Sequence, residues 1–373
     1  MDVTTSEAQQ AVADAARGLL QRRGGVARAR GIVDGGGSLV DHPLWAEVIG
    51  LGWAGLVVPE AHGGLGLGMS EAVVLLEEAG RTLAPLPLLS TTWAALAVTA
   101  LGSPLQQETL LPALAEGTTQ VALAVDEPGR YGPPRAEVLR HRGGLRLRGE
   151  KTLVVDGASA GVLLVLVANR EQLGLVVVPA SADGVEVTRQ QTFDATRDYA
   201  RLRLRDVAVP LEALLGSDDE RSSGVTAADV VDRCRVVLAA ELVGVGSQAL
   251  SSAAAYVSER RQFGTAVGSY QGVSHPLARA RIALQSASSL VAYAAWCADH
   301  GDDRGPESAA MAKAAAGDAA CEATATSIQS HGGIGFTWET DPHLFLKRAR
   351  AGQALLGDAS WQRERIAQLV LDR

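Results

Sequence analysis

The sequence predicts an α+β fold in which a β domain lies between two helical domains. Apolar residues recur with the period of amphipathic helices in the first and last thirds of the chain. In the middle third they alternate or form short continuous runs, as strands do. Because the strands follow one another without intervening helices, the order favours α+β layers over alternating βαβ units. We expect domains over residues 1–118, 119–222 and 223–373.

The N-terminal domain is expected to be helical. Ser6 is a suitable N-cap for a helix over residues 7–22, whose apolar face carries Leu19 and Leu20. The glycine-rich stretch 24–37 is interpreted as a break in the helical pattern. Ser70 is expected to cap the second of four further helices, which are predicted at 44–49, 71–81, 91–100 and 106–115.

The β domain is predicted from short apolar or alternating runs that turn signals separate, such as Arg142-Gly143-Gly144. The expected strands cover residues 121–125, 138–141, 145–148, 162–167, 173–178, 202–205 and 207–210. A joint rich in glycine and acidic residues, 216–224, is expected to lead into the C-terminal domain. There, four helices are predicted over residues 227–260, 271–300, 306–330 and 361–371.

Composition and charge argue against several classes of protein. Of the 373 residues 47% are apolar and the net charge is only -8, which argues against a disordered chain. There are 42 acidic residues against 34 basic ones, so we expect no nucleic-acid partner. The most apolar runs reach about ten residues, half of what a membrane helix needs. With no secretory signal pattern at the start, we expect no membrane contact and a cytoplasmic location.

The three cysteines, Cys234, Cys297 and Cys321, cannot form a fully paired disulfide framework. Their spacing matches no zinc site, and no other residues have the spacing of metal ligands. We therefore expect reduced, buried thiols and no metal.

Three glycine-containing motifs have both a functional and a structural interpretation. The loop 63–68 resembles a dinucleotide turn but lacks a βαβ setting, which favours a plain tight loop. The segment 260–264, Arg-Arg-Gln-Phe-Gly, ends a long helix and offers guanidinium groups to a phosphate, or is only a solvated helix end. The segment 329–336 lets a ligand approach the backbone closely, or is only an interhelical connection.

In their order and spacing, these motifs resemble those of the acyl-CoA dehydrogenase family over nearly the whole chain. The N-terminal third supplies Leu51-Gly52-Trp53-Ala54-Gly55, then Val58-Pro59-Glu60 with Gly63-Gly64-Leu65-Gly66. The C-terminal third supplies Glu259-Arg260-Arg261-Gln262-Phe263-Gly264, Gly268-Ser269-Tyr270-Gln271 and the run from Gln329 to Phe336.

The resemblance implies a helical domain, a β-barrel-like domain and a four-helix bundle, assembled as a dimer of dimers. It implies FAD held across a subunit interface and α,β-dehydrogenation of an acyl-CoA thioester, with electron-transfer flavoprotein as the electron acceptor. The residues that match those reaching the partner subunit's FAD are Arg260, Phe263, Gln271, Gln329, Gly332 and Gly333. By the same resemblance, Arg235 binds substrate.

This chain departs from the family pattern where a subunit builds its own active site. Leu356 stands where the family usually carries its catalytic glutamate, and Cys234 stands at the family's second position for the base. A thiol with an ordinary pKa of about 8.5 replaces a carboxylate poorly. The loop Asp126-Glu127-Pro128-Gly129-Arg130-Tyr131-Gly132 keeps Glu-Pro but loses the family's Gly-Ser. The segment after Lys151 also lacks the expected Trp.

Two carboxylates remain as candidates for the base. Asp358 lies two residues past the usual position, and it is alternatively a loop or N-cap residue. Glu241 lies in the apolar run 238–245, where desolvation would raise its pKa, and it is alternatively a structural carboxylate paired with an arginine.

Elements that serve a neighbour's FAD are therefore present, while those of the chain's own active site are altered. The run 357–365 also resembles the branch of heterotetrameric bacterial acyl-CoA dehydrogenases that act on steroid side chains and other bulky acids. We hypothesise a subunit that lacks the base and works with a homologous acyl-CoA dehydrogenase subunit. The alternatives are a self-sufficient homo-oligomeric dehydrogenase or oxidase with an atypical base, and a flavin-free acyl-CoA-binding or scaffold protein.

Overall fold

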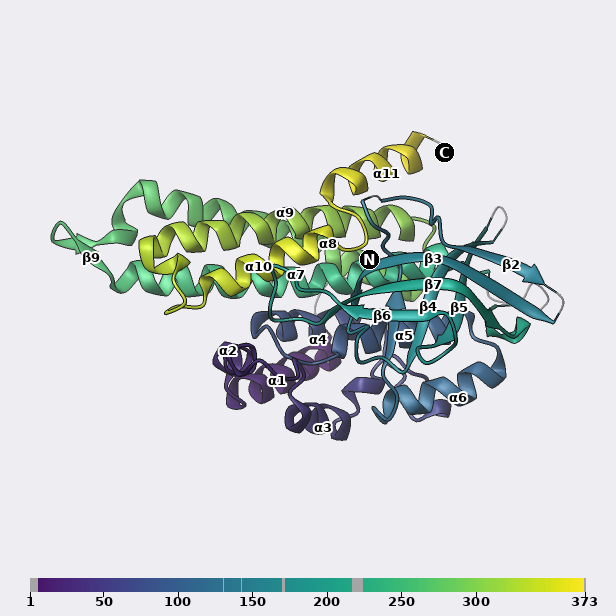
Figure 1. Ribbon diagram of the computed structural model, residues 1–373. Helices are drawn as coiled ribbons and strands as arrows, with labels where there is room; N and C mark the ends of the chain where they lie inside the picture. The colour runs from purple at the N-terminus through teal and green to yellow at the C-terminus, as the bar shows by residue number, and fades with distance from the viewer. Residues whose placement is uncertain (1–5, 130, 142, 170–171, 217–223, 372–373) are drawn as a thin grey trace.

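The computed structural model describes residues 6–129, 131–141, 143–169, 172–216 and 224–371. In it, a mixed sheet lies over an N-terminal group of helices and beside one end of a long C-terminal bundle (Figure 1). The predicted α+β class with helical outer domains is confirmed. The expected change of domain at 222–223 and most of the joint 216–224 fall outside the described residues.

The N-terminal helices begin and end close to their predicted limits. They are α1 (Glu7–Arg22), α2 (Gly25–Gly35), α3 (His42–Gly50), α4 (Met69–Arg81), α5 (Leu88–Leu101) and α6 (Pro104–Ala115), with short 3-10 turns η1 (Trp53–Gly55) and η2 (Glu60–His62). The predicted break at 24–37 is wrong, because α2 occupies most of it. Glycines mark its ends, and its Arg28 and Arg30 bind Asp41 and Asp341, which lie outside the helix.

Helix α4 begins two residues earlier than its expected cap implies. Ser70 lies inside the helix, and the carboxylate of Asp299, from the C-terminal bundle, accepts the N–H groups of Met69 and Ser70. The carboxylate of Glu71 accepts the N–H of Gly68 at 3.0 Å. Carboxylates at a helix N-terminus satisfy free N–H donors and favour the helix dipole. A tertiary contact therefore determines the start of this helix.

The sheet joins β1 (Val121–Ala124), β2 (Glu137–His141), β3 (Gly144–Val155), β4 (Val162–Asn169), β5 (Gln172–Pro179), β6 (Val185–Arg189), β7 (Tyr199–Val209) and β8 (Leu214–Leu215). Its order is β6-β7-β3-β2-β4-β5-β8, and β1 pairs in parallel with β4. Strand β6 was not predicted, and β3 continues well past the predicted 145–148. Register shifts in the β3–β7 pair, the first between Leu147 and Gly149, disturb the alternation of β3, which explains why its prediction ended at 148.

The C-terminal bundle contains α7 (Ala227–Glu259), α8 (Gln271–His300), α9 (Gly305–His331), α10 (Pro342–Ala354) and α11 (Ala359–Leu371). The β9–β10 hairpin (Arg261–Gln262 and Thr265–Ala266) and the 3-10 turn η4 (Val267–Ser269) connect α7 to α8, and η5 (Gly332–Phe336) lies between α9 and α10. A further 3-10 turn, η3 (Leu211–Ala213), lies in the β domain between β7 and β8. Helix α10 was not predicted, because its lysine and arginines interrupt the apolar pattern. It lies beside α7 and α9 and is part of the bundle.

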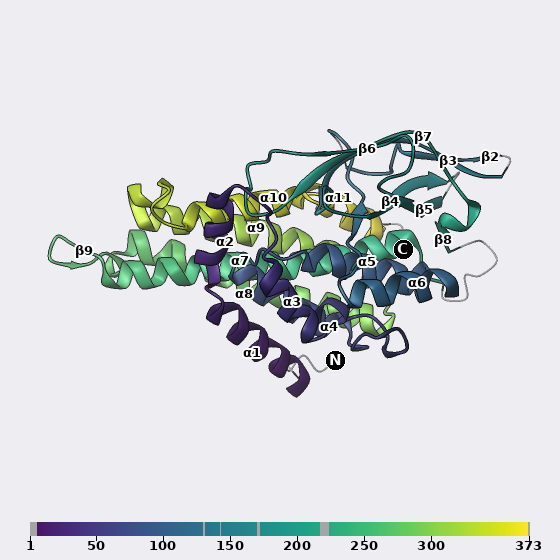
Figure 2. The same ribbon diagram turned by 60° about the horizontal axis from the view of Figure 1, so that its bottom comes forward.

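Helix α7 is the central element of the molecule. It packs against α4, α5, α8, α9 and α10, and Figure 2 shows it running between the N-terminal helices and α9. Among the described helices it is long and apolar enough to cross a bilayer, but 83% of its most apolar stretch is buried within the protein. Glycines allow its close approach to α4, since a Cβ at Gly80 would lie 2.2 Å from the carbonyl oxygen of Glu241.

Candidate active-site cavity

A cavity of about 610 Å³ lies between the β domain and the C-terminal bundle. Its walls come from the loop after β1, from β4 and β5, from the first turns of α7, and from the turn that precedes α11. The lining includes Asp126, Tyr131, Arg235, Leu356, Trp361 and Glu364. A cavity at a junction of domains with a few polar groups among apolar ones is where ligand sites usually occur.

Leu356 lies in the turn between α10 and α11, which forms one wall of the cavity. Its φ is +56°, a conformation that costs an L-residue energy unless other contacts hold it. Its N–H donates to Oδ2 of Asp126 at 3.0 Å, and its carbonyl oxygen accepts Nε of Arg235 at 2.9 Å. Nε2 of Gln362 donates to the same carbonyl at 2.9 Å. Three elements thus fix the backbone of Leu356, and its apolar side chain is only 3% exposed.

Gly357 allows this turn to close against α11. Its φ is +95°, and a Cβ there would lie 2.4 Å from the Trp361 ring. That ring in turn lies under the guanidinium of Arg235, 5.1 Å from Cζ to the ring centroid, within range of a cation–π contact.

Arg235 lines the cavity, as a substrate-binding residue must, but its N–H groups are largely engaged. One guanidinium nitrogen donates to Asp232, and Nε donates to Leu356. Both terminal nitrogens of Arg365 also bind Asp232, each at 2.6 Å. The role of Arg235 in substrate binding therefore stays a prediction, and its observed contacts stabilise the cavity wall.

Asp126 is the carboxylate that the sequence did not single out. Burial raises the pKa of its carboxyl group, while the Leu356 N–H, Arg235, Lys313 and Lys151 oppose that rise. The available signal was its place in the altered loop 126–132, which we interpreted only as a loss of flavin contacts. Its partner Leu356 is 230 residues away in sequence, so only the fold brings the two together.

Lys313 supports the same turn from inside the bundle. Its Nζ donates to the carbonyl oxygens of Gln353 at 2.9 Å and Gly357 at 3.1 Å, and the residue is 1% exposed. Burial lowers the pKa of Lys313 to about 7, although the nearby carboxylate of Asp126 acts in the opposite direction. A buried lysine bound by two carbonyls and no carboxylate is costly.

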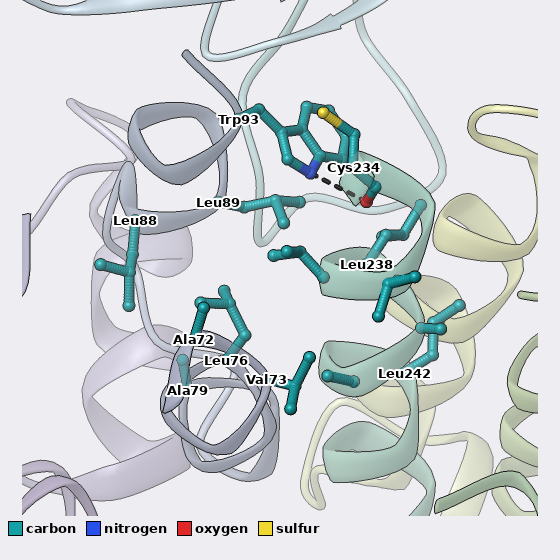
Figure 3. Packing of buried hydrophobic residues seen from close by; sticks show 14 of the residues in the cluster. Ala72, Val73, Leu76, Ala79, Leu88, Leu89, Trp93, Cys234, Leu238 and Leu242 are labelled. Atoms are coloured by element: carbon teal, nitrogen blue, oxygen red, sulfur yellow. Dashed lines mark hydrogen bonds between the residues drawn. The ribbon is translucent and has the colours of Figure 1, made fainter. Parts of the chain in front are cut away.

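Cys234, at the second position for a base, is fully buried between α5 and α7 (Figure 3). The indole N–H of Trp93 donates to its carbonyl oxygen at 3.0 Å, and Leu89 and Leu238 pack around the pair. Burial raises the pKa of the Cys234 thiol far above its ordinary value. A thiol without solvent contact that stays protonated does not act as a base.

Asp358 caps helix α11. Its Oδ1 accepts the N–H of Trp361 at 2.9 Å, which matches the N-cap alternative. The carboxylate lies close to the cavity, since it and Asp126 both add to the effect of burial that raises the pKa of Tyr131 to about 12. Its role as a proton acceptor stays a prediction.

Glu241 lies in a network of buried charges outside the lining of the cavity. Its Oε1 accepts hydrogen bonds from Arg348, at 2.8 Å, and from Arg197. Arg348 also binds Oδ2 of Asp194 at 2.9 Å and the carbonyl oxygen of Thr196 at 2.8 Å. This arrangement matches the structural alternative for Glu241, in which arginines neutralise a buried carboxylate.

The residues expected to reach a neighbour's FAD lie at the opposite end of the bundle. Figure 1 places the β9 hairpin far from α11, with the long helices between them. Every member of the set is exposed: Arg260, Phe263, Gln271, Gln329, Gly332 and Gly333. Phe263 is 96% exposed although its φ is +53°, an unusual state for an aromatic side chain.

This exposed end and the cavity differ in how well they fit FAD. A guanidinium, an aromatic ring, two primary amides and an open glycine backbone suit a dinucleotide, because they bind a diphosphate, pack on a ring and allow close approach. The glycines are open, since a Cβ on Gly332 or Gly333 would meet nothing within 4 Å. In the cavity, by contrast, the cations of the described lining are bound to Asp232 and Leu356. The residues therefore fit FAD at the end of the bundle and not in the chain's own cavity.

Comparisons with known proteins agree with this architecture. The family models for the acyl-CoA dehydrogenase N-terminal and C-terminal domains match residues 6–118 and 225–371. The acyl-CoA dehydrogenase FadE12 of Mycobacterium tuberculosis is 34% identical over 323 residues, which cover 82% of each chain. The chain belongs to the acyl-CoA dehydrogenase family. It is an oxidoreductase of the type that acts on CH–CH groups.

Other relatives of the family cover almost the whole chain. Acyl-CoA dehydrogenase IpdE2 of M. tuberculosis is 31% identical over 362 residues, covering 95% of this chain and 94% of that one. A structure of a variant of the Tcur3481-Tcur3483 steroid ACAD has a TM-score of 0.91 at 31% identity, covering 99% of each chain. The ChsE4-ChsE5 complex of M. tuberculosis has a TM-score of 0.90 at 26% identity, covering 100% of each chain.

Proposed function

We propose that this chain is one subunit of a heteromeric, FAD-dependent acyl-CoA dehydrogenase that desaturates the α,β-bond of an acyl-CoA thioester. A homologous subunit supplies the catalytic base and the FAD-facing cavity. This chain supplies the exposed end of its bundle to the FAD of that subunit. The enzyme acts in the cytoplasm as a tetramer and passes its electrons to electron-transfer flavoprotein.

The observation that carries the proposal is the contact between Leu356 and Asp126. At the family's position for the base, the chain presents an apolar side chain whose backbone N–H is bound to Asp126. At the second position it presents the buried thiol of Cys234. FAD, when bound, accepts a hydride from the β-carbon, but removal of the α-proton needs a base with access to the substrate.

The far end of the bundle supports the role of a cofactor-completing partner. In the tetramer, Arg260 binds the FAD diphosphate and Phe263 packs on a ring of the cofactor. The amides of Gln271 and Gln329 supply further hydrogen bonds, and Gly332 and Gly333 let the cofactor approach the backbone closely. An exposed aromatic ring with a strained backbone is costly in a monomer and useful at an interface.

Two relatives support a heteromeric assembly and a bulky substrate. The ChsE4-ChsE5 structure is described as a complex, and the Tcur3481-Tcur3483 protein is described as a steroid ACAD. We extend this to a steroid side chain, or a fatty acid of similar bulk, as the acyl group.

The test is to produce the chain alone and together with a homologous subunit that carries the family's glutamate. We expect the co-purified complex to be yellow and its flavin absorption to bleach when acyl-CoA is added without oxygen. The chain alone should show no bleaching. A partner variant without its glutamate is the control, and its complex should hold FAD without bleaching. Full dehydrogenation by the chain alone would overturn the proposal.

A second candidate is a self-sufficient enzyme in which Asp358 is the base, because that carboxylate lies beside the cavity. In that case the chain alone bleaches with substrate and Asp358→Asn does not. A complex that purifies without flavin and binds acyl-CoA would favour the flavin-free scaffold.

A further inference from the structure

We propose that Asp126 closes this chain's own cavity to a flavin, so that the subunit takes part in FAD binding only through the exposed end of its bundle. The inference rests on the proposed function. It adds the residue that makes the cavity, unlike the exposed end of the bundle, unsuited to a flavin.

Asp126 connects the two walls of the cavity. Its main-chain oxygen accepts the N–H of Thr152 on β3 at 2.9 Å, which fixes the residue to the sheet. Its side-chain Oδ2 accepts the N–H of Leu356 at 3.0 Å, which fixes it to the turn between α10 and α11. No hydrogen bond from the described residues reaches Oδ1 of this half-buried carboxylate. Asp126 thus occupies a donor on the far wall and presents an acceptor at the cavity.

This arrangement opposes an isoalloxazine ring on chemical grounds. The polar edge of the oxidised ring consists mainly of carbonyl oxygens and ring nitrogens that accept hydrogen bonds, and the reduced ring carries negative charge. Oδ2 of Asp126 accepts the Leu356 N–H in either protonation state of the carboxyl group, so it competes with these ring edges for the same donor. The Leu356 N–H is the kind of backbone donor that a ring carbonyl needs, and Asp126 has taken it.

The other charged residues of the lining offer a flavin no cation without an acidic partner. A terminal nitrogen of Arg235 is bound to the carboxylate of Asp232. Arg365 is bound to Asp232 through both of its terminal nitrogens. Glu364 adds a further carboxylate to the lining. In the part of the cavity that the structure describes, every cation thus has an acidic partner, which disfavours the diphosphate of FAD as well.

The experiment uses the full chain and riboflavin, which carries the isoalloxazine ring without a diphosphate. Asp126→Ala and Asp126→Thr remove the carboxyl group that accepts the Leu356 N–H, and Glu364→Gln is the matched control. The control removes a carboxylate of the same cavity that does not contact Leu356. We expect wild type and Glu364→Gln to leave riboflavin fluorescence unquenched. Both Asp126 variants should quench it saturably, with an affinity at least about tenfold above that of wild type, or about 1.4 kcal/mol.

Several outcomes would overturn the inference. Saturable quenching by wild type equal to that of the variants would do so. So would two folded Asp126 variants, verified by circular dichroism, that leave riboflavin unquenched. If neither variant folds, the FAD content of the wild-type complex decides. One FAD for each pair of subunits supports the inference, whereas one FAD for each chain contradicts it. Failure of the proposed function would look different. In that case the two subunits would form no complex, or the flavin of the complex would not bleach with acyl-CoA.

Discussion

The guanidinium of Arg348 donates to Oε1 of Glu241 at 2.8 Å, and this bond joins α10 to α7 inside the bundle. Arg197 reaches the same oxygen from the β domain. The carboxylate therefore neutralises two buried cations that come from different domains. Glu241 therefore holds α10 and the β domain against α7. Its substitution should lower the stability of the fold and should not act directly on catalysis.

We expect Glu241→Gln to lower the free energy of unfolding by about 3 kcal/mol, because it takes the paired carboxylate from buried Arg197 and leaves buried Arg348 with Asp194 alone. Urea unfolding followed by circular dichroism measures the change. Glu186→Gln is the matched control, since its carboxylate pairs with Arg203 and Arg205 on the surface. That control should change stability by less than about 0.5 kcal/mol. A stable Glu241→Gln complex that no longer bleaches with acyl-CoA would instead identify Glu241 as the base.

Phe263→Ala should weaken FAD binding by the complex and leave the chain itself intact. The ring is 96% exposed, so its removal takes no packing from this subunit. We expect the dissociation constant for FAD to rise at least about tenfold. Leu105→Ala serves as control, because Leu105 is exposed on α6 in the N-terminal domain. Dilution of the complex, followed by release of FAD fluorescence, provides the measurement. Equal FAD release from the two variants would contradict the role of Phe263.

Lys313 should make stability depend on pH above neutrality. Its pKa is about 7 in the folded chain and near 10.5 when unfolded, so between these values the unfolded state binds the extra proton. The contribution of Lys313 to stability therefore increases as pH rises from about 7 toward 10, by at most about 1.4 kcal/mol per pH unit. Lys313→Met removes this slope and takes a hydrogen-bond donor from the carbonyl oxygens of Gln353 and Gly357. We expect the variant to be less stable than wild type, by a margin that is wider at pH 9 than at pH 7. Parallel unfolding curves at the two pH values would contradict this.

Gly357→Ala should disturb the wall of the cavity. The new Cβ would lie 2.4 Å from the ring of Trp361, and the positive φ adds strain. We expect a loss of about 2 kcal/mol or more together with a change in tryptophan fluorescence. Gly264→Ala is the matched control, because its φ is also positive but a Cβ there meets nothing within 4 Å. The control should lose only about 1 kcal/mol and keep its fluorescence. Similar losses for both variants would show that packing on Trp361 is not critical.

The sequence predicted helices and strands correctly where the apolar periodicity was strong. The prediction failed where contacts between distant segments determine the secondary structure. Helix α8 has the predicted limits, because its capping and apolar period are local features. Helix α10 was missed because Arg348, which the fold buries, looks like a surface residue in the sequence. Helix α2 was missed because the glycine-rich stretch 24–37 is typical of a loop, and the bonds of Arg28 to Asp41 and of Arg30 to Asp341 form only in the fold.

The sequence by itself determined the family and the two changes that matter most, Leu356 and Cys234 at the positions for a base. Residue identity at a motif position is local information, and it needs no coordinates. Only the tertiary structure decided that Asp126 holds the N–H of Leu356 and that Glu241 is neutralised by arginines. It also placed the β9–β10 hairpin, which carries Phe263, far from α11, whose residues line the cavity (Figure 1). Contacts between residues more than 100 positions apart depend on how the elements pack, and composition and periodicity do not encode that packing.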